Sequence, residues 1–346
     1  MQIHNLKMLV LSLTGDCNFA CKYCYAAEHN TSMMSLDTAM AAVNLAAQSK
    51  NKFILQFSGG EPLLNFSVIQ CLAEYVKKEN IPAVMQIQTN ASLITDEVAL
   101  YLKEHKIAVG VSLDGTPKVN DKLRIAKNNK SASAETIRGI EILKKYNMAC
   151  GITCVVTEDN VKEMPEIVDM AYFLGNVRRI GFDLLRSQGR GSNLLPPDEE
   201  ILRKSISEVY ERAKELHRLI GYKIEFSQQE KSKDLLLGTE CEFGHCYAMN
   251  GQAAFVDAKG DIYSCSSLVG NKKYFIGNVY TGIEENLLKE VKERIRQAMS
   301  FCKFCKDFKN CGGGCFARWY VNEKKQKYVS ECHLKKISKV YALRNK

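Results

Sequence analysis

Short apolar runs alternate with stretches of helical periodicity over the first half of the chain. Runs rich in β-branched and aromatic residues predict strands at 7–13, 53–57, 84–88, 107–112, 151–156 and 178–184. Apolar residues that recur every three to four positions predict helices at 36–49, 66–79, 95–104, 135–146 and 161–174. Such alternation favours a parallel sheet covered by helices. We therefore predict an α/β fold, a partial (β/α)6 TIM-like barrel.

Unusual residues follow four of these predicted strands. A cysteine triplet follows the first strand, and the segments 58–62 (SGGEP), 88–90 (QTN) and 112–115 (SLDG) end the next three. In barrels of this kind the chemistry lies at the C-terminal ends of the strands. The four segments are therefore expected to converge on one rim.

The composition changes towards the C-terminus. Glycines and prolines at 186–198 indicate a linker or loop before a helix at about 198–218. Cysteines then become frequent, and we expect Cys-flanked turns in place of long periodic elements. The predicted domains are a barrel at 1–185, a linker and helix at 186–238, and a small Cys-rich domain at 239–346.

The 14 cysteines and the lack of an export signal point to free thiols and metal binding. We expect a cytoplasmic protein with no membrane partner. The net charge of +9 would fall once thiolates bind metal, and the basic residues are interleaved with Glu on predicted helices. No nucleic-acid partner is predicted, whereas an anionic peptide would suit the charge. Cys71, Cys150 and Cys154 are expected to pack as small apolar side chains.

The spacing Cys17-x3-Cys21-x2-Cys24 places three thiols in one loop. Iron-sulfur clusters take thiolate ligands held close together, and three ligands leave one iron open. A Cys3His zinc site that includes His29 is the alternative.

This spacing, with Tyr23 before the third cysteine and GGEP after the next strand, resembles the radical SAM (S-adenosylmethionine) superfamily. The resemblance implies a [4Fe-4S] cluster on the three catalytic cysteines. It also implies that the segment with Gly59, Gly60 and Glu61 holds the SAM amino group, and that Tyr23 packs near adenine.

Further SAM contacts follow from the same resemblance. Ser112 and Asp114 match the segment whose serine reaches the ribose, and Gln88 and Asn90 match the QTN segment beside it. Arg138 stands where related enzymes place a basic residue near the SAM carboxylate.

A second constellation resembles the SPASM domain of peptide-modifying radical SAM enzymes. Its core is Cys302-x2-Cys305-x5-Cys311-x3-Cys315, with further cysteines on both sides. The resemblance implies two auxiliary [4Fe-4S] clusters with crossed ligation. Cluster I would use Cys241, Cys246, Cys265 and Cys315, and cluster II would use Cys302, Cys305, Cys311 and Cys332. A pair of zinc sites is the alternative.

The resemblance implies three [4Fe-4S] clusters, SAM as a cofactor, and a peptide or protein substrate. The C-terminal segments resemble maturases of Cys-rich ribosomal peptides, so we favour formation of a thioether or another crosslink. Related sulfatase-maturing enzymes have an Asp after the cysteine that corresponds to Cys265, and Ser266 occupies that place here. Oxidation of a Ser or Cys side chain, as in sulfatase maturation, is therefore the alternative function.

Two kinds of partner follow. A donor such as flavodoxin or ferredoxin would reduce the first cluster, and the short segment before the first strand favours a separate leader-binding protein. A non-catalytic iron-sulfur electron carrier or zinc-binding protein is the alternative from another class.

Overall fold

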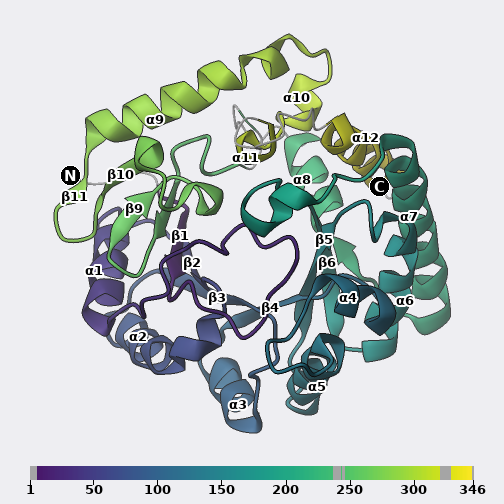
Figure 1. Ribbon diagram of the computed structural model, residues 1–346, viewed down its shortest axis with the longest axis horizontal. Helices are drawn as coiled ribbons and strands as arrows, with labels where there is room; N and C mark the ends of the chain where they lie inside the picture. Colours follow the sequence, from purple (N-terminus) through teal and green to yellow (C-terminus); the bar gives the residue numbers. More distant parts are fainter. Residues whose placement is uncertain (1–5, 237–242, 244–245, 320–328, 345–346) are drawn as a thin grey trace.

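The computed structural model describes residues 6–236, 243, 246–319 and 329–344. Figure 1 shows strands that curve around a central space with helices outside them. The six predicted strands are β1 (Met8–Ser12), β2 (Phe53–Ser58), β3 (Ala83–Thr89), β4 (Ala108–Ser112), β5 (Cys150–Val156) and β6 (Val177–Leu184). The predicted helices are α1 (Leu36–Ala47), α2 (Phe66–Lys78), α3 (Asp96–Glu104), α5 (Ala132–Lys145), α6 (Met164–Leu174) and α7 (Glu199–Ile220). The predicted α/β architecture is confirmed.

Local sequence explains where these helices begin. The side chains of Ser35, Thr95, Ser131 and Asp198 accept hydrogen bonds from backbone N–H groups in the first turns of α1, α3, α5 and α7. Each cap satisfies donors that have no partner inside the helix. The strand-to-helix connections are therefore fixed by the sequence at the start of each helix.

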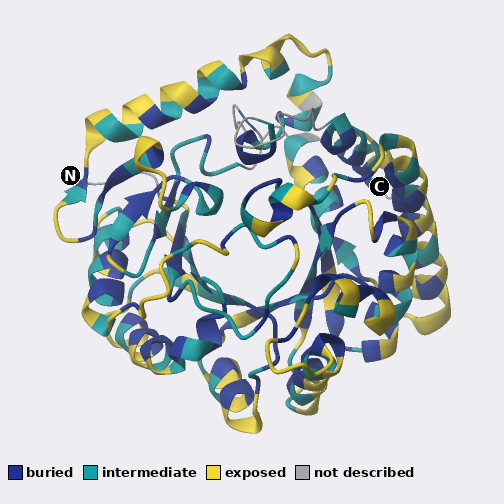
Figure 2. Cartoon of the chain, in the orientation of Figure 1, coloured by how far each residue is buried: buried dark blue, intermediate teal, exposed yellow. Residues whose placement is uncertain are grey.

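The two faces of the barrel sheet differ in polarity. In β2, Phe53 and Phe57 are buried, whereas Gln56 alternates with them and lines two cavities of the barrel. Side chains alternate between the faces of a strand, so the apolar set faces the helices. Figure 2 shows dark, buried faces where the helices meet the strands and yellow, exposed faces outside. The core thus lies between sheet and helices, and the barrel interior is left polar.

The sheet continues into the C-terminal part. Its order is β11-β10-β9-β8-β1-β2-β3-β4-β5-β6-β7, and β8 pairs in parallel with β1. The added strands are β7 (Glu225–Phe226), β8 (Ala253–Val256), β9 (Asp261–Tyr263), β10 (Phe275–Asn278) and β11 (Gly282–Ile283). The predicted domain boundaries remain a prediction, although backbone hydrogen bonds join the two parts.

Long helices in the Cys-rich part correct our expectation of Cys-flanked turns. In α9 (Glu285–Ala298), Val291 and Ile295 are buried four residues apart and charged residues cover the rest. That spacing is a helical stripe. The other additional helices are α4 (Pro117–Leu123), α8 (Ser227–Leu236), α10 (Phe308–Cys311), α11 (Phe316–Trp319) and α12 (Val329–Arg344). Short 3₁₀ turns are η1 (Pro62–Asn65), η2 (Val161–Glu163), η3 (Gly189–Asn193), η4 (Ser266–Leu268), η5 (Lys272–Tyr274) and η6 (Ser300–Phe304).

Two smaller observations complete the fold. Cys150 and Cys154 are buried as expected, but Cys71 is exposed because it lies on the outer side of α2. Within the described ranges, no helix is long and apolar enough to cross a bilayer.

Candidate active site

A cavity of about 400 Å³ lies at the C-terminal ends of the barrel strands. It brings together most of the N-terminal residues singled out from the sequence. These are Cys17, Cys21, Tyr23, Cys24, Gly59, Gly60, Gln88, Asn90 and Ser112. Segments that end β1, β2, β3 and β4 thus share one space, as the strand-end rule predicts.

The three cysteines lie in a partly buried loop. Burial raises the pKa of the Cys17 thiol to about 12 and that of the Cys21 thiol to about 11. The Cys17 sulfur accepts a hydrogen bond from the Phe19 backbone N–H at 3.3 Å. Such thiols stay protonated unless a cation offsets the cost of the buried thiolate, which is what a bound metal does. The donor set therefore fits an iron-sulfur cluster.

Within the part of the chain that the structure describes, no group of three or more His, Cys, Asp or Glu side chains converges as ligands of a single metal ion would. Ligands of zinc all point at one atom, whereas thiolates on a four-iron cluster each bind a different iron. The choice between a cluster and a zinc site at the cysteine loop stays a prediction.

The two glycines of the GGEP segment hold the second loop against the cysteine loop. Gly59 has φ +135°, and a Cβ there would lie 2.3 Å from the Thr14 carbonyl oxygen. A Cβ on Gly60 would lie 2.1 Å from the Asp16 carbonyl oxygen. No other residue permits this approach. Both glycines are therefore required to pack the cavity wall beside Cys17.

Glu61 is fully buried and is not among the residues that line the cavity. Its carboxylate accepts hydrogen bonds from the Thr89 hydroxyl at 2.7 Å, the Asn90 N–H at 2.8 Å and the Leu63 N–H at 3.1 Å. Burial raises its pKa to about 6, against the lowering effect of these donors. The structure thus shows Glu61 joining the GGEP segment to the end of β3, and its contact with SAM remains a prediction.

Glu61→Gln is expected to lower the free energy of unfolding by about 1–3 kcal/mol near neutral pH. One carboxylate oxygen serves the Asn90 N–H and the other serves the Leu63 N–H. An amide NH2 in either place leaves a buried backbone donor without an acceptor. Urea denaturation of the two proteins measures the difference, and an unchanged midpoint would refute this account of Glu61.

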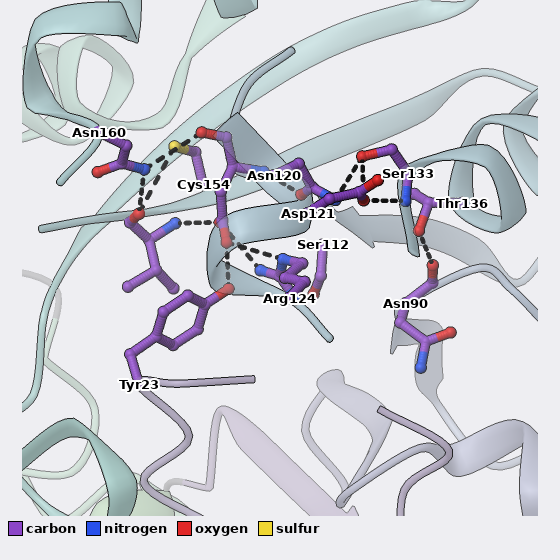
Figure 3. Close-up of polar contacts among 12 residues, drawn as sticks. Tyr23, Asn90, Ser112, Asn120, Asp121, Arg124, Ser133, Thr136, Cys154 and Asn160 are labelled. Carbon is purple, nitrogen blue, oxygen red and sulfur yellow. Dashed lines mark hydrogen bonds and ion pairs between the residues drawn. The ribbon is translucent and has the colours of Figure 1, made fainter. Parts of the chain in front are cut away.

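Asp114 is the centre of a buried network at the end of β4. It accepts hydrogen bonds from the Tyr23 hydroxyl and from the Val155 backbone N–H, and Arg124 forms an ion pair with it at 2.9 Å. Tyr23 and Arg124 thus meet at this one carboxylate, and Figure 3 shows their two side chains close together with their polar contacts dashed. Burial raises the pKa of Tyr23 well above its usual value. Asp114 therefore acts on the cavity by fixing the Tyr23 ring, which lines it.

Amide and hydroxyl groups form the adjoining wall. Gln88 donates to the Ser112 hydroxyl at 3.0 Å and accepts from the Thr153 hydroxyl at 3.3 Å. The Asn90 amide donates to Asn18 at 2.9 Å and lies 3.8 Å from the Cys17 sulfur. These groups are oriented by one another, so the wall is organised to hydrogen-bond a polar ligand.

The structure places Arg138 away from this wall. Its guanidinium donates to the backbone carbonyl of Ser92 at 2.5 Å and contacts that of Ile94 at 3.4 Å, and the residue does not line the cavity. The cavity instead receives Arg124 and Arg186. The predicted contact of Arg138 with a SAM carboxylate has no support in this geometry and stays untested.

Sequence reasoning missed a charged group beside the end of β6. The Arg186 guanidinium binds the Asp183 carboxylate at 2.6 Å and lies 5.1 Å from the centre of the Tyr25 ring. All three residues line the cavity. The place of Asp183 and Arg186 at the C-terminal end of β6 would have marked them as candidates.

Comparison with known proteins agrees with this geometry. Residues 11–171 match the description Radical SAM superfamily. An uncharacterized protein of Methanocaldococcus jannaschii is 37% identical over 271 residues, which are 78% of this chain and 87% of that protein. The chain belongs to the radical SAM superfamily. Enzymes of this superfamily use a [4Fe-4S] cluster and SAM.

Two further similarities extend over nearly the whole chain. A cysteine-type anaerobic sulfatase-maturating enzyme of Clostridium perfringens is 26% identical over 341 residues, which are 90% of this chain and 88% of that enzyme. The solved structure of anSMEcpe with bound AdoMet and the Cp18Cys peptide has a TM-score of 0.81 at 22% identity. That match covers 98% of this chain and 97% of the other, and it shows that the two share a fold.

The C-terminal cysteines of this radical SAM chain fall into two neighbouring sets. Burial raises the pKa of Cys246 to about 12, and Cys315 and Cys265 raise it further. Burial likewise raises the pKa of Cys332 to about 11, with additional effects of Cys311 and Cys302. Each set contains three of the four cysteines that we assigned to one auxiliary cluster, and the crossed ligation stays a prediction.

Cys305 is exposed and interacts electrostatically with Lys336, as Cys332 does. Cys241 lies outside the described residues. The assignment of all eight cysteines to clusters therefore stays a prediction.

Buried charges connect the barrel cavity to the cysteine set that contains Cys246, Cys265 and Cys315. Arg318 binds Asp183 and pairs with Glu331 at 2.9 Å, and Glu331 accepts a hydrogen bond from the Cys315 N–H at 3.0 Å. Arg186 also acts electrostatically on Cys315 and Cys265. The radical SAM cavity and the Cys-rich part thus share one polar network.

Proposed function

We propose that this protein modifies a ribosomally made peptide or protein, forming a thioether or another crosslink by way of a 5'-deoxyadenosyl radical. The observation that carries the proposal is the polar network that runs from the barrel cavity to Cys315. A radical made in the cavity needs an exit for the electron left on the substrate, and the neighbouring cysteine set lies where such an exit is needed.

The residues of the barrel cavity support this role. Cys17, Cys21 and Cys24 would hold a [4Fe-4S] cluster, which supplies one electron to cleave SAM into methionine and a 5'-deoxyadenosyl radical. The tightly packed loop at Gly60 leaves backbone groups close to where a SAM amino group would bind. Tyr23, held by Asp114, offers a ring face in the cavity wall for adenine.

The hydroxyl of Ser112 and the amide of Gln88 would bind the ribose, because they already hydrogen-bond each other at the cavity wall. Water must be excluded from a site that produces a carbon radical. The bound peptide, packed between the barrel rim and the Cys-rich part, would complete that exclusion.

The remaining elements of the proposal concern partners and auxiliary cofactors. We assign two auxiliary [4Fe-4S] clusters to the two cysteine sets and a domain boundary near residue 239. A flavodoxin or ferredoxin would supply the electrons, and a separate protein would present the leader segment of the substrate. The protein would act in the cytoplasm.

Sulfatase-type oxidation of Ser or Cys is the second candidate. The Clostridium perfringens relative favours it. Ser266 weighs against it. This residue lines the cavity, and it follows Cys265 at the position where the resemblance to sulfatase-maturing enzymes leads one to expect an Asp. The Ser266 side chain hydrogen-bonds Tyr25 instead. A hydroxyl at this position is a poor proton acceptor, so we favour crosslink formation.

The decisive experiment uses the anaerobically reconstituted and reduced full chain. Liquid chromatography with mass detection is expected to show 5'-deoxyadenosine, which a non-catalytic electron carrier or zinc protein would not produce. Co-expressed small Cys-rich peptides encoded beside this gene are expected to lose about 2 Da per crosslink, one hydrogen from each joined partner. Absence of 5'-deoxyadenosine from fully loaded, reduced protein would overturn the enzymatic proposal.

A further inference from the structure

A second cavity, of about 540 Å³, lies towards the N-terminal ends of the barrel strands and is called the lower cavity. The active-site cavity at the C-terminal ends of the strands is called the upper cavity. The lower cavity shares Gln56, Gln88 and Thr153 with the upper cavity and reaches the N-terminal ends of β4, β5 and β6. The two spaces therefore meet inside the barrel. A closed TIM barrel is filled at this level by branched apolar side chains.

Amide side chains form one wall of the lower cavity. The Gln86 amide donates to the Gln56 carbonyl oxygen at 2.7 Å, and the row continues to Gln88. A glutamine side chain has two donor hydrogens and two acceptor lone pairs, so each keeps capacity beyond these bonds. The wall can therefore hydrogen-bond the N–H and C=O groups of an extended peptide.

Glycines on the next two strands make the adjoining part of this wall thin. Gly110 and Gly151 are directly paired across β4 and β5. A Cβ on Gly110 would lie 2.5 Å from the Gln88 amide oxygen, so that glycine makes room for the amide row. A Cβ on Gly151 would meet only the Cβ of Arg179 at 3.7 Å and its carbonyl oxygen at 3.8 Å. The space in front of Gly151 is thus open for a ligand.

The lower end of this cavity is basic. Arg178, Arg179 and Lys231 line it, and no described lining residue is acidic. Two carboxylates lie close by: Glu225 pairs with Arg179 at 3.6 Å, and Asp183 acts electrostatically on Lys231.

The three cations are arranged around the cavity end. Arg178 donates to the Gly175 and Val177 carbonyls and lies 4.3 Å from the centre of the Tyr222 ring, and no carboxylate of the described residues forms an ion pair with it. Lys231 is exposed at the cavity wall. A concave, cationic wall concentrates anions.

We infer that the lower cavity is a second substrate subsite, which binds an extended, acidic segment of the peptide next to the residue modified in the upper cavity. This inference rests on the proposed function, because it needs a peptide substrate. The amide row binds the backbone, the open face at Gly151 gives it room, and Arg178, Arg179 and Lys231 bind the carboxylates.

The first test measures binding of fluorescein-labelled hexaglutamate to the reconstituted full chain by fluorescence anisotropy, with hexalysine as the opposite-charge probe. We expect hexaglutamate to bind and hexalysine not to bind. Lys231→Glu is expected to weaken hexaglutamate binding about tenfold. Lys204→Glu makes the same charge change on the outer face of α7 and is expected to leave binding unchanged. Equal effects of the two variants would show general charge attraction and overturn the subsite.

The second test fills the cavity without changing charge. Gly151→Leu is expected to abolish hexaglutamate binding, and Gly151→Ala is expected to retain it, because a single Cβ meets only ordinary contacts. Circular dichroism melts establish that both variants fold. Wild-type-like binding by folded Gly151→Leu would overturn the inference. These binding assays are read independently of 5'-deoxyadenosine, so a failed subsite and a failed enzymatic proposal are distinguished.

Discussion

Replacing Cys17, Cys21 and Cys24 together with alanine is expected to reduce 5'-deoxyadenosine formation to the level of the enzyme-free control. The three thiols share one cavity, and the raised pKa values of Cys17 and Cys21 mean that these two become thiolates only when a metal binds. Without them SAM has no electron source at this site. Product is measured by mass spectrometry, and iron analysis is expected to show a loss of about four iron atoms per chain.

The matched control for this variant is Cys71→Ala. Cys71 is an exposed free thiol on α2, outside the cavity, so its removal tests cysteine loss alone. It is expected to leave both iron content and SAM cleavage unchanged. Continued 5'-deoxyadenosine formation by the triple variant would sink the assignment of the first cluster.

The second large effect concerns the Cys-rich part. Cys302→Ala combined with Cys305→Ala is expected to stop peptide product while some uncoupled 5'-deoxyadenosine still forms. The cavity that contains Cys17, Cys21 and Cys24 lies in the barrel, and neither Cys302 nor Cys305 lines it. Loss of this set would remove an electron acceptor without removing the SAM site. The ratio of peptide product to 5'-deoxyadenosine, measured in one reaction, reports the uncoupling.

Two results bear on that prediction. Electron paramagnetic resonance of the reduced variant in the presence and absence of SAM is expected to keep the SAM-sensitive signal, which shows that the barrel remains intact. If the variant instead formed crosslinked peptide at the wild-type ratio, an essential role for Cys302 and Cys305 would have to be abandoned.

The barrel could be predicted from sequence because each strand carries its own pattern. In β2 the apolar residues Phe53 and Phe57 alternate with polar ones, and the side chain of Ser35 marks the start of α1. The helix α4 was missed because seven residues are too few for a periodic pattern to emerge. Strand β7 has only two residues and depends on its pairing with β6.

The site could be predicted where the spacing of residues along the sequence determines which side chains come together. The cysteine triplet and Gly60 meet in one cavity because they end neighbouring strands. The ion-pair partner of a buried charge was not predictable: Asp114 pairs with Arg124, ten residues on, which the sequence analysis had not singled out. In the same way, Arg138 binds backbone carbonyls after β3, a contact that depends on how α5 packs.

The pairing of β8 with β1 has a consequence for how the chain acquires its structure. During synthesis β1 emerges first, and it gains β2 on one side long before β8 is made. Until then its other edge carries unpaired backbone groups open to association with other chains. Contacts so distant in sequence slow folding. Truncation before residue 253 would leave that edge permanently bare.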